Sequence, residues 1–354
     1  MSITPKITIV KKQGKDFSVL AEEVLVALQK SKQTIIRVLF FTNVANNNDF
    51  LQKQASVLTK SKLLFAEKTP LISIISQTPF EYDLIAEIHS TDASVTFKNA
   101  FGTNYIVAKN NEEKALFTTL TPEYSTINAP IAQQAEKTFA TLTAIFEKEG
   151  MTIDCILRQW NYVERIIDTD SLGQRYQQFN DARSHFYAQC FWQNGYPAAT
   201  GIGTQKGGLS IDIDAYAEIY TKAIDNPLQI AAHRYSENVL EAGKQPQQTT
   251  PKFERARIID NTLYISGTAA IRGEETIANN AKEQTQITIE NILALVQQTD
   301  KTKLDYLRVY IKNKTDFTTV KNTVSQLLPN IETLFVEADI CRANLLVEIE
   351  AVAE

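Results

Sequence analysis

Apolar positions along the chain follow two spacings, and each spacing predicts a different element. Runs that are apolar throughout, or that alternate with polar residues, are typical of strands, and apolar residues three or four positions apart are typical of helices. In the first third of the chain the pattern predicts elements of both kinds, with Asp49 as a possible helix N-cap. The strands are 33–42, 71–76, 94–99 and 104–108, and the helices are 17–30 and 49–58.

From about residue 130 the two spacings alternate in a regular order. A helix predicted over 132–148 ends at Gly150, because glycine readily adopts the left-handed conformation that closes helices. The next elements are predicted as strand 153–163, helix 173–192 and strand 209–215. The last third is predicted to contain two strands within 256–269 around a turn at Asp260-Asn261, helix 278–296, strand 304–312, helix 317–328, and strands 331–336 and 345–352.

The order of these elements repeats, and so do some residues. Leu157-Arg158-Gln159-Trp160 corresponds in this repeat to Leu307-Arg308-Val309-Tyr310. After a deletion, Asp212-Ile213-Asp214-Ala215 corresponds to Glu348-Ile349-Glu350-Ala351. The pattern therefore indicates a β-β-α-β-α-β(β) unit that is used twice.

Such a unit has one sheet face covered by helices, so a second copy or another subunit must bury the other face. Ligand sites commonly lie in the clefts between units of this kind. The polar stretch 236–252 contains Gly and Pro without periodicity and is predicted as a linker or long loop. We therefore expect an N-terminal domain over 1–235, consisting of a divergent unit with an extension, and a C-terminal domain over 253–354.

Composition narrows the classes of function. The chain has 354 residues, of which 44% are hydrophobic and 22% charged, as in folded rather than disordered proteins. Its net charge of −5 disfavours nucleic acid and anionic lipid as partners. We expect no membrane span and no signal peptide, since no apolar stretch is long enough for either. Three scattered cysteines and three isolated histidines favour neither a disulfide nor a metal site, so we expect no metal, no cofactor and a reducing cytoplasm.

Several motifs resemble known proteins. Tyr264-Ile265-Ser266-Gly267-Thr268-Ala269, Ile340-Cys341-Arg342 and Leu346-Val347-Glu348-Ile349-Glu350-Ala351 resemble the RidA/YjgF fold. In the middle of the chain, Arg158-Gln159-Trp160-Asn161-Tyr162 and Tyr196-Pro197-Ala198-Ala199-Thr200-Gly201-Ile202-Gly203 resemble the chorismatases, which are built on a tandem RidA-like core. The resemblance is clear over about residues 130–354 and loose before them.

The resemblance implies a fold and an activity. The fold class would be α+β, with tandem RidA/YjgF-like (chorismate-mutase-like) units, mixed sheets and helices on one face. The activity would be cofactor-free cleavage of the enolpyruvyl ether of chorismate to pyruvate and a hydroxybenzoate, with 3-hydroxybenzoate as the expected product. Hydrolysis to a dihydroxycyclohexadiene carboxylate is the alternative. A monomer and a homo-oligomer both stay open, including the trimer that single RidA-like units form.

Cleavage of this ether requires a proton donor and groups that bind two carboxylates. The enolpyruvyl methylene carbon must take a proton from a carboxylic acid whose pKa is raised by burial. Glu348 has apolar strand neighbours, and the resemblance places the general acid on it. Arginine binds carboxylates bidentately, and the resemblance assigns Arg342 to a substrate carboxylate. From the residues alone, Glu348 also fits a solvated edge strand and Arg342 a surface ion pair.

The other candidates are less specific. In the family that the chain resembles, a cysteine at the position of Cys341 goes with 3-hydroxybenzoate production, and its alternative is an inert core thiol. Gly267, Thr268 and Ala269 follow a strand, where they either present backbone N–H groups to an anion or form a tight turn. The remaining candidates for substrate binding are Tyr176, Arg183, Gly201 in a substrate-lining loop, Tyr235 and Arg255.

Two other classes of function remain open on these observations. A RidA-type enamine/imine deaminase would use Arg342 and an acid to hydrate an imine. A catalytically silent member of the superfamily would bind a small ligand or partner and tolerate Glu348→Gln. The middle motifs favour a chorismatase, because a minimal RidA-like protein does not need them.

Overall fold

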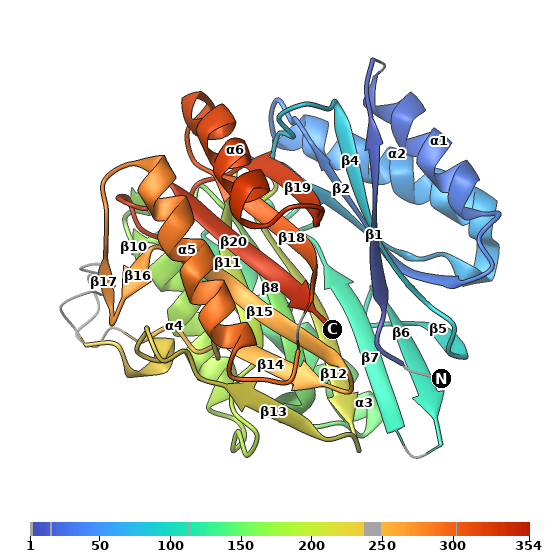
Figure 1. Cartoon of the computed structure of the whole chain (residues 1–354). Coiled ribbons are helices and arrows are strands. Elements are labelled where there is room, and N and C mark those ends of the chain that lie inside the picture. Colours follow the sequence, from blue (N-terminus) through green and yellow to red (C-terminus); the bar gives the residue numbers. More distant parts are fainter. Residues whose placement is uncertain (1–2, 15, 112, 237–248, 302) are drawn as a thin grey trace.

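A computed structural model describes residues 3–14, 16–111, 113–236, 249–301 and 303–354. The described residues form three main sheets that follow one another along the chain, each with two long helices on its outer face (Figure 1). Each of these helix-covered sheets is called a unit below. Among the described helices, none is long and apolar enough to cross a membrane.

The first unit has the strand order β1-β4-β2-β3. It contains β1 (Lys6–Lys12), α1 (Phe17–Leu28), β2 (Thr34–Thr42), α2 (Asn47–Phe65), β3 (Leu71–Ile75) and β4 (Leu84–Thr91). Asp16 caps α1 by accepting hydrogen bonds from the backbone N–H groups of Ser18 and Val19. Apolar residues of both helices pack on one face of this sheet and form its core.

The second unit has the order β11-β8-β12-β7-β6-β5. It contains β5 (Val95–Ala100), β6 (Thr103–Asn110), β7 (Glu113–Leu120), α3 (Ile131–Glu149), β8 (Ile156–Glu164), α4 (Arg175–Tyr187), β11 (Ala198–Thr204) and β12 (Leu209–Ala217). A small hairpin of β9 (Thr169–Asp170) and β10 (Gly173–Gln174) precedes α4. As predicted, Gly150 ends α3 in the left-handed conformation, at φ 63°.

The third unit has the order β13-β14-β15-β20-β18-β19. It contains β13 (Thr221–Ile224), β14 (Ala256–Ile259), β15 (Thr262–Ala269), α5 (Ala281–Val296), β18 (Leu304–Ile311), α6 (Phe317–Leu327), β19 (Glu332–Glu337) and β20 (Val347–Ala353). The short pair β16 (Ile271–Arg272) and β17 (Glu275–Thr276) follows β15.

All three units share one topology. In each, a strand leads through a helix to the next strand and through a second helix to an edge strand that runs parallel to it, and the last strand returns to the middle of the sheet. The predicted α+β fold class with repeated units is therefore confirmed. Residues 6–91, which we expected to extend the first of two units, form a sheet of their own with this topology.

Sequence patterns missed five strands of the three main sheets, namely β1, β4, β7, β11 and β13, and the four two-residue strands β9, β10, β16 and β17. The assignment of Asp49 as N-cap was wrong, because Asn46 caps α2 by accepting from the Asp49 backbone N–H at 3.0 Å. The domain boundaries at 235 and 253 stay a prediction, and most of the predicted linker 236–252 lies outside the described residues. β13, which precedes that linker, already pairs with β14 of the third unit.

The sheet faces without helices pack against one another at the centre of the molecule. Successive residues of a strand point to opposite faces, so Val38 and Phe40 of β2 contact the helices of their own unit, while Leu39 and Phe41 face the centre. There they join Trp160 and other residues of β8, β18 and the loop before β20 in one apolar cluster. The centre thus holds the three units together.

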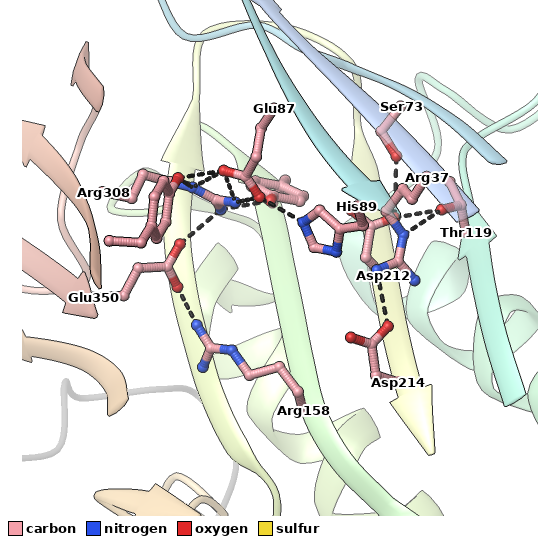
Figure 2. Close-up of polar contacts among 12 residues, drawn as sticks. Arg37, Ser73, Glu87, His89, Thr119, Arg158, Asp212, Asp214, Arg308 and Glu350 are labelled. Carbon is pink, nitrogen blue, oxygen red and sulfur yellow. Dashed lines mark hydrogen bonds and ion pairs between the residues drawn. The ribbon is translucent and has the colours of Figure 1, made fainter. Parts of the chain in front are cut away.

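Buried ion pairs cross this centre from unit to unit (Figure 2). Three arginines occupy equivalent positions on β2, β8 and β18, and each bonds a carboxylate on the last strand of the next unit in cyclic order. The pairs are Arg37 with Asp214, Arg158 with Glu350, and Arg308 with Glu87. All six side chains are almost fully buried. Because each of these three pairs joins two different units, they fix how the units are arranged.

Replacing Arg308 with methionine is expected to destabilise the protein strongly. Burial alone would raise the pKa of Glu87, and Arg308 and His89 beside it hold that pKa well below its ordinary value. Removing the guanidinium leaves a buried carboxylate without its main partner, which typically costs about 3–5 kcal/mol. The free energy of unfolding in urea measures this cost.

Lys321→Met is the control, because it removes an exposed ion pair with Glu81, an interaction typically worth about 0–1 kcal/mol. Equal destabilisation by both substitutions would contradict the structural role given to the buried pair.

Candidate active site

A small cavity opens between the second and third units, where α4 faces the end of β20. Residues from five stretches of the chain line it. They are Gln174, Tyr176, Gln177, Asn180, Tyr235, Pro251, Phe253, Arg255, Gly267, Ala269, Ile271, Cys341, Arg342, Leu345 and Glu348. The cavity therefore contains aromatic and apolar walls, one carboxyl, one thiol and two guanidinium groups.

Glu348 lies deep in this cavity on β20. Its strand neighbours Val347 and Ile349 pack in the core under α5 and α6, so alternation turns Glu348 to the opposite face, and its side chain is only 4% exposed. The carboxyl lies where a Cβ atom on Gly267 would be, so position 267 has no room for a side chain without displacing it. Within the described residues, no hydrogen bond or ion pair involves this carboxyl.

These surroundings make Glu348 an acid near neutral pH. Burial raises its pKa first, the charge of Glu350 raises it further, and Arg158 and Arg255 oppose the rise only in part, leaving the pKa at about 8. At pH 7 the side chain is therefore mostly a neutral carboxylic acid, which can donate a proton.

Two guanidinium groups flank Tyr235 at the wall of the cavity. Arg255 Nη2 donates to Tyr235 Oη at 2.6 Å, and Arg342 lies over the Tyr235 ring at 5.2 Å. Arg342 Nη1 also donates to the Glu274 carbonyl oxygen at 2.8 Å, and Arg255 Nε has no hydrogen-bond partner among the described residues. The pair leaves unused N–H donors and positive charge for an anionic ligand.

Cys341 lies between the cavity and the apolar core. Burial and the neighbouring Glu348 raise the pKa of its thiol to about 12. The side chain is therefore a neutral thiol and not a thiolate, so it is a poor nucleophile in this state.

Eight of the predicted site residues line this cavity together, namely Glu348, Cys341, Arg342, Gly267, Ala269, Tyr176, Tyr235 and Arg255. The other three lie outside it. Thr268 Oγ1 donates to the Ser266 carbonyl oxygen, and Arg183 is buried against Phe179 and donates to Asn180. Gly201 lies in strand β11 and not in a loop, and its role there is steric, since a Cβ atom would come within 2.9 Å of the Tyr176 ring.

Several lining residues were missed by sequence reasoning. Gln174 ends β10 just before α4, Asn180 lies on the face of α4 that carries Tyr176, and Leu345 precedes β20. Asn180 lies one helical turn after Tyr176, so helical periodicity could have linked the two. Leu345 carries no such signal, because only the packing of two distant segments brings it to the cavity.

Comparison with known proteins gives a family match for the third unit. Residues 243–354 match the family described as endoribonuclease L-PSP.

The middle of the chain defines the family more narrowly. Residues 87–215 match the family described as chorismatase FkbO/Hyg5-like, N-terminal. A chorismatase of Streptomyces rapamycinicus is 30% identical over 240 residues, which cover 62% of this chain and 70% of that protein. A 3-hydroxybenzoate synthase of Streptomyces hygroscopicus is 27% identical over 247 residues, covering 63% and 71%. The chain belongs to the chorismatase family and is an enzyme of that type.

A solved structure supports the same fold. This chain and the crystal structure of a chorismatase align over the full length of both, with a TM-score of 0.73 and 20% sequence identity.

The protonation state of Glu348 gives a test that does not depend on activity. The infrared difference spectrum between the native protein and Glu348→Gln should contain the band of a protonated carboxyl group at pH 7. That band should disappear as the pH rises through about 8, where this buried group ionises. A spectrum that shows an ionised carboxylate at pH 6 would contradict the account of the site.

Proposed function

We propose that the protein cleaves the enolpyruvyl ether of chorismate and releases pyruvate. The observation that carries this proposal is the buried Glu348 carboxyl, which has no ion-pair partner among the described residues and lies in a cavity that also contains Arg255 and Arg342. A neutral acid beside two guanidinium groups suits a dianionic substrate that must accept a proton at carbon. The names of the related chorismatases support the same reaction.

Proton transfer is the first step. A vinyl ether is inert until its methylene carbon takes a proton, so Glu348 donates its carboxyl proton to the enolpyruvyl methylene and becomes a carboxylate. A C–H bond forms, and the carbon next to the ether oxygen becomes an oxocarbenium ion. The new Glu348 carboxylate lies close to this cation and stabilises it electrostatically.

Capture of the oxocarbenium carbon then releases pyruvate. If the neighbouring ring hydroxyl attacks, it loses its proton and its oxygen bonds to the oxocarbenium carbon. The bond between this oxygen and the ring then breaks, and the oxygen becomes the keto oxygen of pyruvate. The bond between the same carbon and the former ether oxygen breaks as well, so the ether oxygen remains on the ring as the phenol. The ring carbon that bears the former ether oxygen loses a proton as the ring becomes aromatic. The protons lost by this carbon and by the ring hydroxyl equal those taken up by the phenol oxygen and by Glu348, which is protonated again. The products are pyruvate and 3-hydroxybenzoate, which together have the composition of chorismate. If water attacks instead, one water is consumed and the second product is a dihydroxycyclohexadiene carboxylate.

We take 3-hydroxybenzoate as the product. Cys341 supports this choice, because its neutral thiol lies in the same cavity as Glu348. A second support is that this chain matches 71% of the length of a related 3-hydroxybenzoate synthase. Neither route is an oxidation or reduction overall, so the reaction as written requires no cofactor. The free state of all three cysteines supports a reducing cytoplasm as the compartment.

Glu348→Gln is expected to lower kcat by at least about 100-fold, since it removes the general acid while keeping the shape of the side chain. Pyruvate release from chorismate is followed by coupling to lactate dehydrogenase, and the second product is identified by chromatography. Glu332→Gln, at an exposed position of β19, is the control and should retain native turnover.

Near-native turnover by a folded Glu348→Gln variant would contradict the mechanism. If the native protein releases ammonia from imino acids and no pyruvate from chorismate, the protein is an imine deaminase instead. A non-aromatic second product would support the hydrolytic route and remove the meaning given to Cys341.

Arg342→Ala is expected to raise KM for chorismate at least about tenfold with a smaller change in kcat, because a guanidinium that binds a substrate carboxylate contributes mainly to binding. Arg342→Lys keeps the charge but not the planar fork, and should give an intermediate KM. Steady-state kinetics with both variants measure this order. An unchanged KM in Arg342→Ala would show that this guanidinium does not bind the substrate.

A further inference from the structure

The three units place an acidic side chain at one equivalent position of their last strands. These side chains are Glu87 on β4, Asp212 on β12 and Glu348 on β20. In their own sheets they lie opposite Leu39, Trp160 and Tyr310, each of which is two residues after the arginine of that unit. The strand register thus makes the three carboxylates structural equivalents, each at an interface between two units.

Glu87 has several partners at its interface. Arg308 Nη2 lies 2.5 Å from both carboxylate oxygens, and Arg308 Nε lies 3.0 Å from one of them. His89 Nε2 is 2.7 Å from the other oxygen, and the Tyr306 hydroxyl also donates to Glu87. A carboxylate held in this way by a bidentate guanidinium stays ionised and cannot serve as an acid.

Asp212 is also engaged, at the interface of the first and second units. Its Oδ1 accepts from Thr119 Oγ1 at 2.6 Å and from Ser73 Oγ at 3.0 Å, and Arg37 Nε lies 3.7 Å away. Figure 2 shows Arg37 between Asp212 and Asp214. Here too an arginine of the neighbouring unit lies against the equivalent carboxylate.

Glu348 differs because, among the described residues, no arginine lies within ion-pair distance of it, whereas Arg37 bonds Asp214 and also reaches Asp212. Arg158 Nη2 pairs with Glu350 and donates to Thr200 Oγ1 at 2.9 Å, and Thr200 Oγ1 in turn donates to Glu350 at 2.6 Å. Arg308 Nη1 approaches Glu350 from the other side at 2.7 Å. Glu350 therefore holds Arg158, a guanidinium whose positive charge also acts on Glu348.

We propose that Glu350 is a positioning residue for this site, which keeps Glu348 available as the acid by holding Arg158 and by placing a negative charge two residues away on the same strand face. The inference rests on the proposed function of Glu348. It also explains why one of three equivalent interfaces carries the reaction: at the other two, arginines engage the equivalent carboxylates directly.

The groups around Glu348 come from every element packed on it. Glu350 on β20 and the cations of Arg158 on β8 and Arg255 before β14 act on its charge, and the thiol of Cys341 and the hydroxyl of Tyr176 on α4 also face it. Arg342 lies next along the chain from Cys341 and contributes positive charge at the cavity wall. Among these groups Glu350 alone adds a fixed negative charge, so its removal should have the clearest effect.

Glu350→Gln removes that charge and leaves Arg158 without a carboxylate partner. The positive charge of Arg158 then acts on Glu348 without the opposing charge of Glu350, so the ionised form of Glu348 is favoured and it loses its proton at lower pH. Because the protonated form is the catalyst, the fall of kcat on the alkaline side should move to lower pH by at least about one pH unit. The pH profile of kcat from pH 5 to pH 9 measures this shift.

Two further variants test the cause. Arg158→Met removes the cation while Glu350 keeps Arg308, so the alkaline fall should move to higher pH. Combining Glu350→Gln with Arg158→Met removes both charges and should return the fall towards its native position. Since Arg158→Met predicts a shift of opposite sign, it tests the proposal even if Glu350→Gln does not fold.

Asp214→Asn is the matched control. Asp214 is the equivalent of Glu350 on β12 and bonds Arg37 at 2.8 Å, so this variant breaks the same kind of buried pair at another interface. It should lower stability without moving the pH profile. If Glu350 had only a structural role, Glu350→Gln would behave in the same way. A Glu350→Gln profile that stays native, or that moves no further than that of Asp214→Asn, would overturn the proposal. If Glu348→Gln is inactive in the same assay, an unshifted Glu350→Gln profile overturns only the role given to Glu350, and the proposed function still stands.

Discussion

The structure depends on buried arginine–carboxylate pairs that cross from one unit to the next. A charge removed from water is costly unless a partner and further hydrogen bonds compensate it, so a buried guanidinium strongly restricts what can face it. Arg37, Arg158 and Arg308 each impose this restriction on the sheet of a neighbouring unit. The apolar cluster around them excludes water, and the two effects together fix three similar units in one cyclic arrangement.

The candidate site follows from a local exception in that arrangement. Two of the three equivalent carboxylates contact arginines, and the third, Glu348, lies in a cavity where the described part of the chain gives it no such partner. Burial destabilises the ionised form of Glu348 and so favours its neutral form. The side chain therefore keeps a proton that it can donate to the substrate. The same fold thus provides scaffold at two interfaces and a reactive group at the third.

The sequence predicted the repeated elements of the second and third units well, because their strands and helices carry clear apolar periodicity. It failed for β1, where lysines at both ends mask a short apolar centre, and for β11, whose glycines are not typical of strands. Glu348 was predicted from its apolar neighbours and from the resemblance. The contact of Thr200 with Glu350 could not be predicted from the sequence, because their strands belong to different units and meet only when the sheets pack.

The most direct test of the account is the crystal structure of the Glu348→Gln variant with chorismate bound. The account predicts chorismate in the cavity between the second and third units, with its enolpyruvyl methylene carbon about 3–3.5 Å from the substituted side chain, as near-attack geometry requires. It also predicts a substrate carboxylate on Arg342. Chorismate bound at another interface, or with its enolpyruvyl group directed away from position 348, would contradict it.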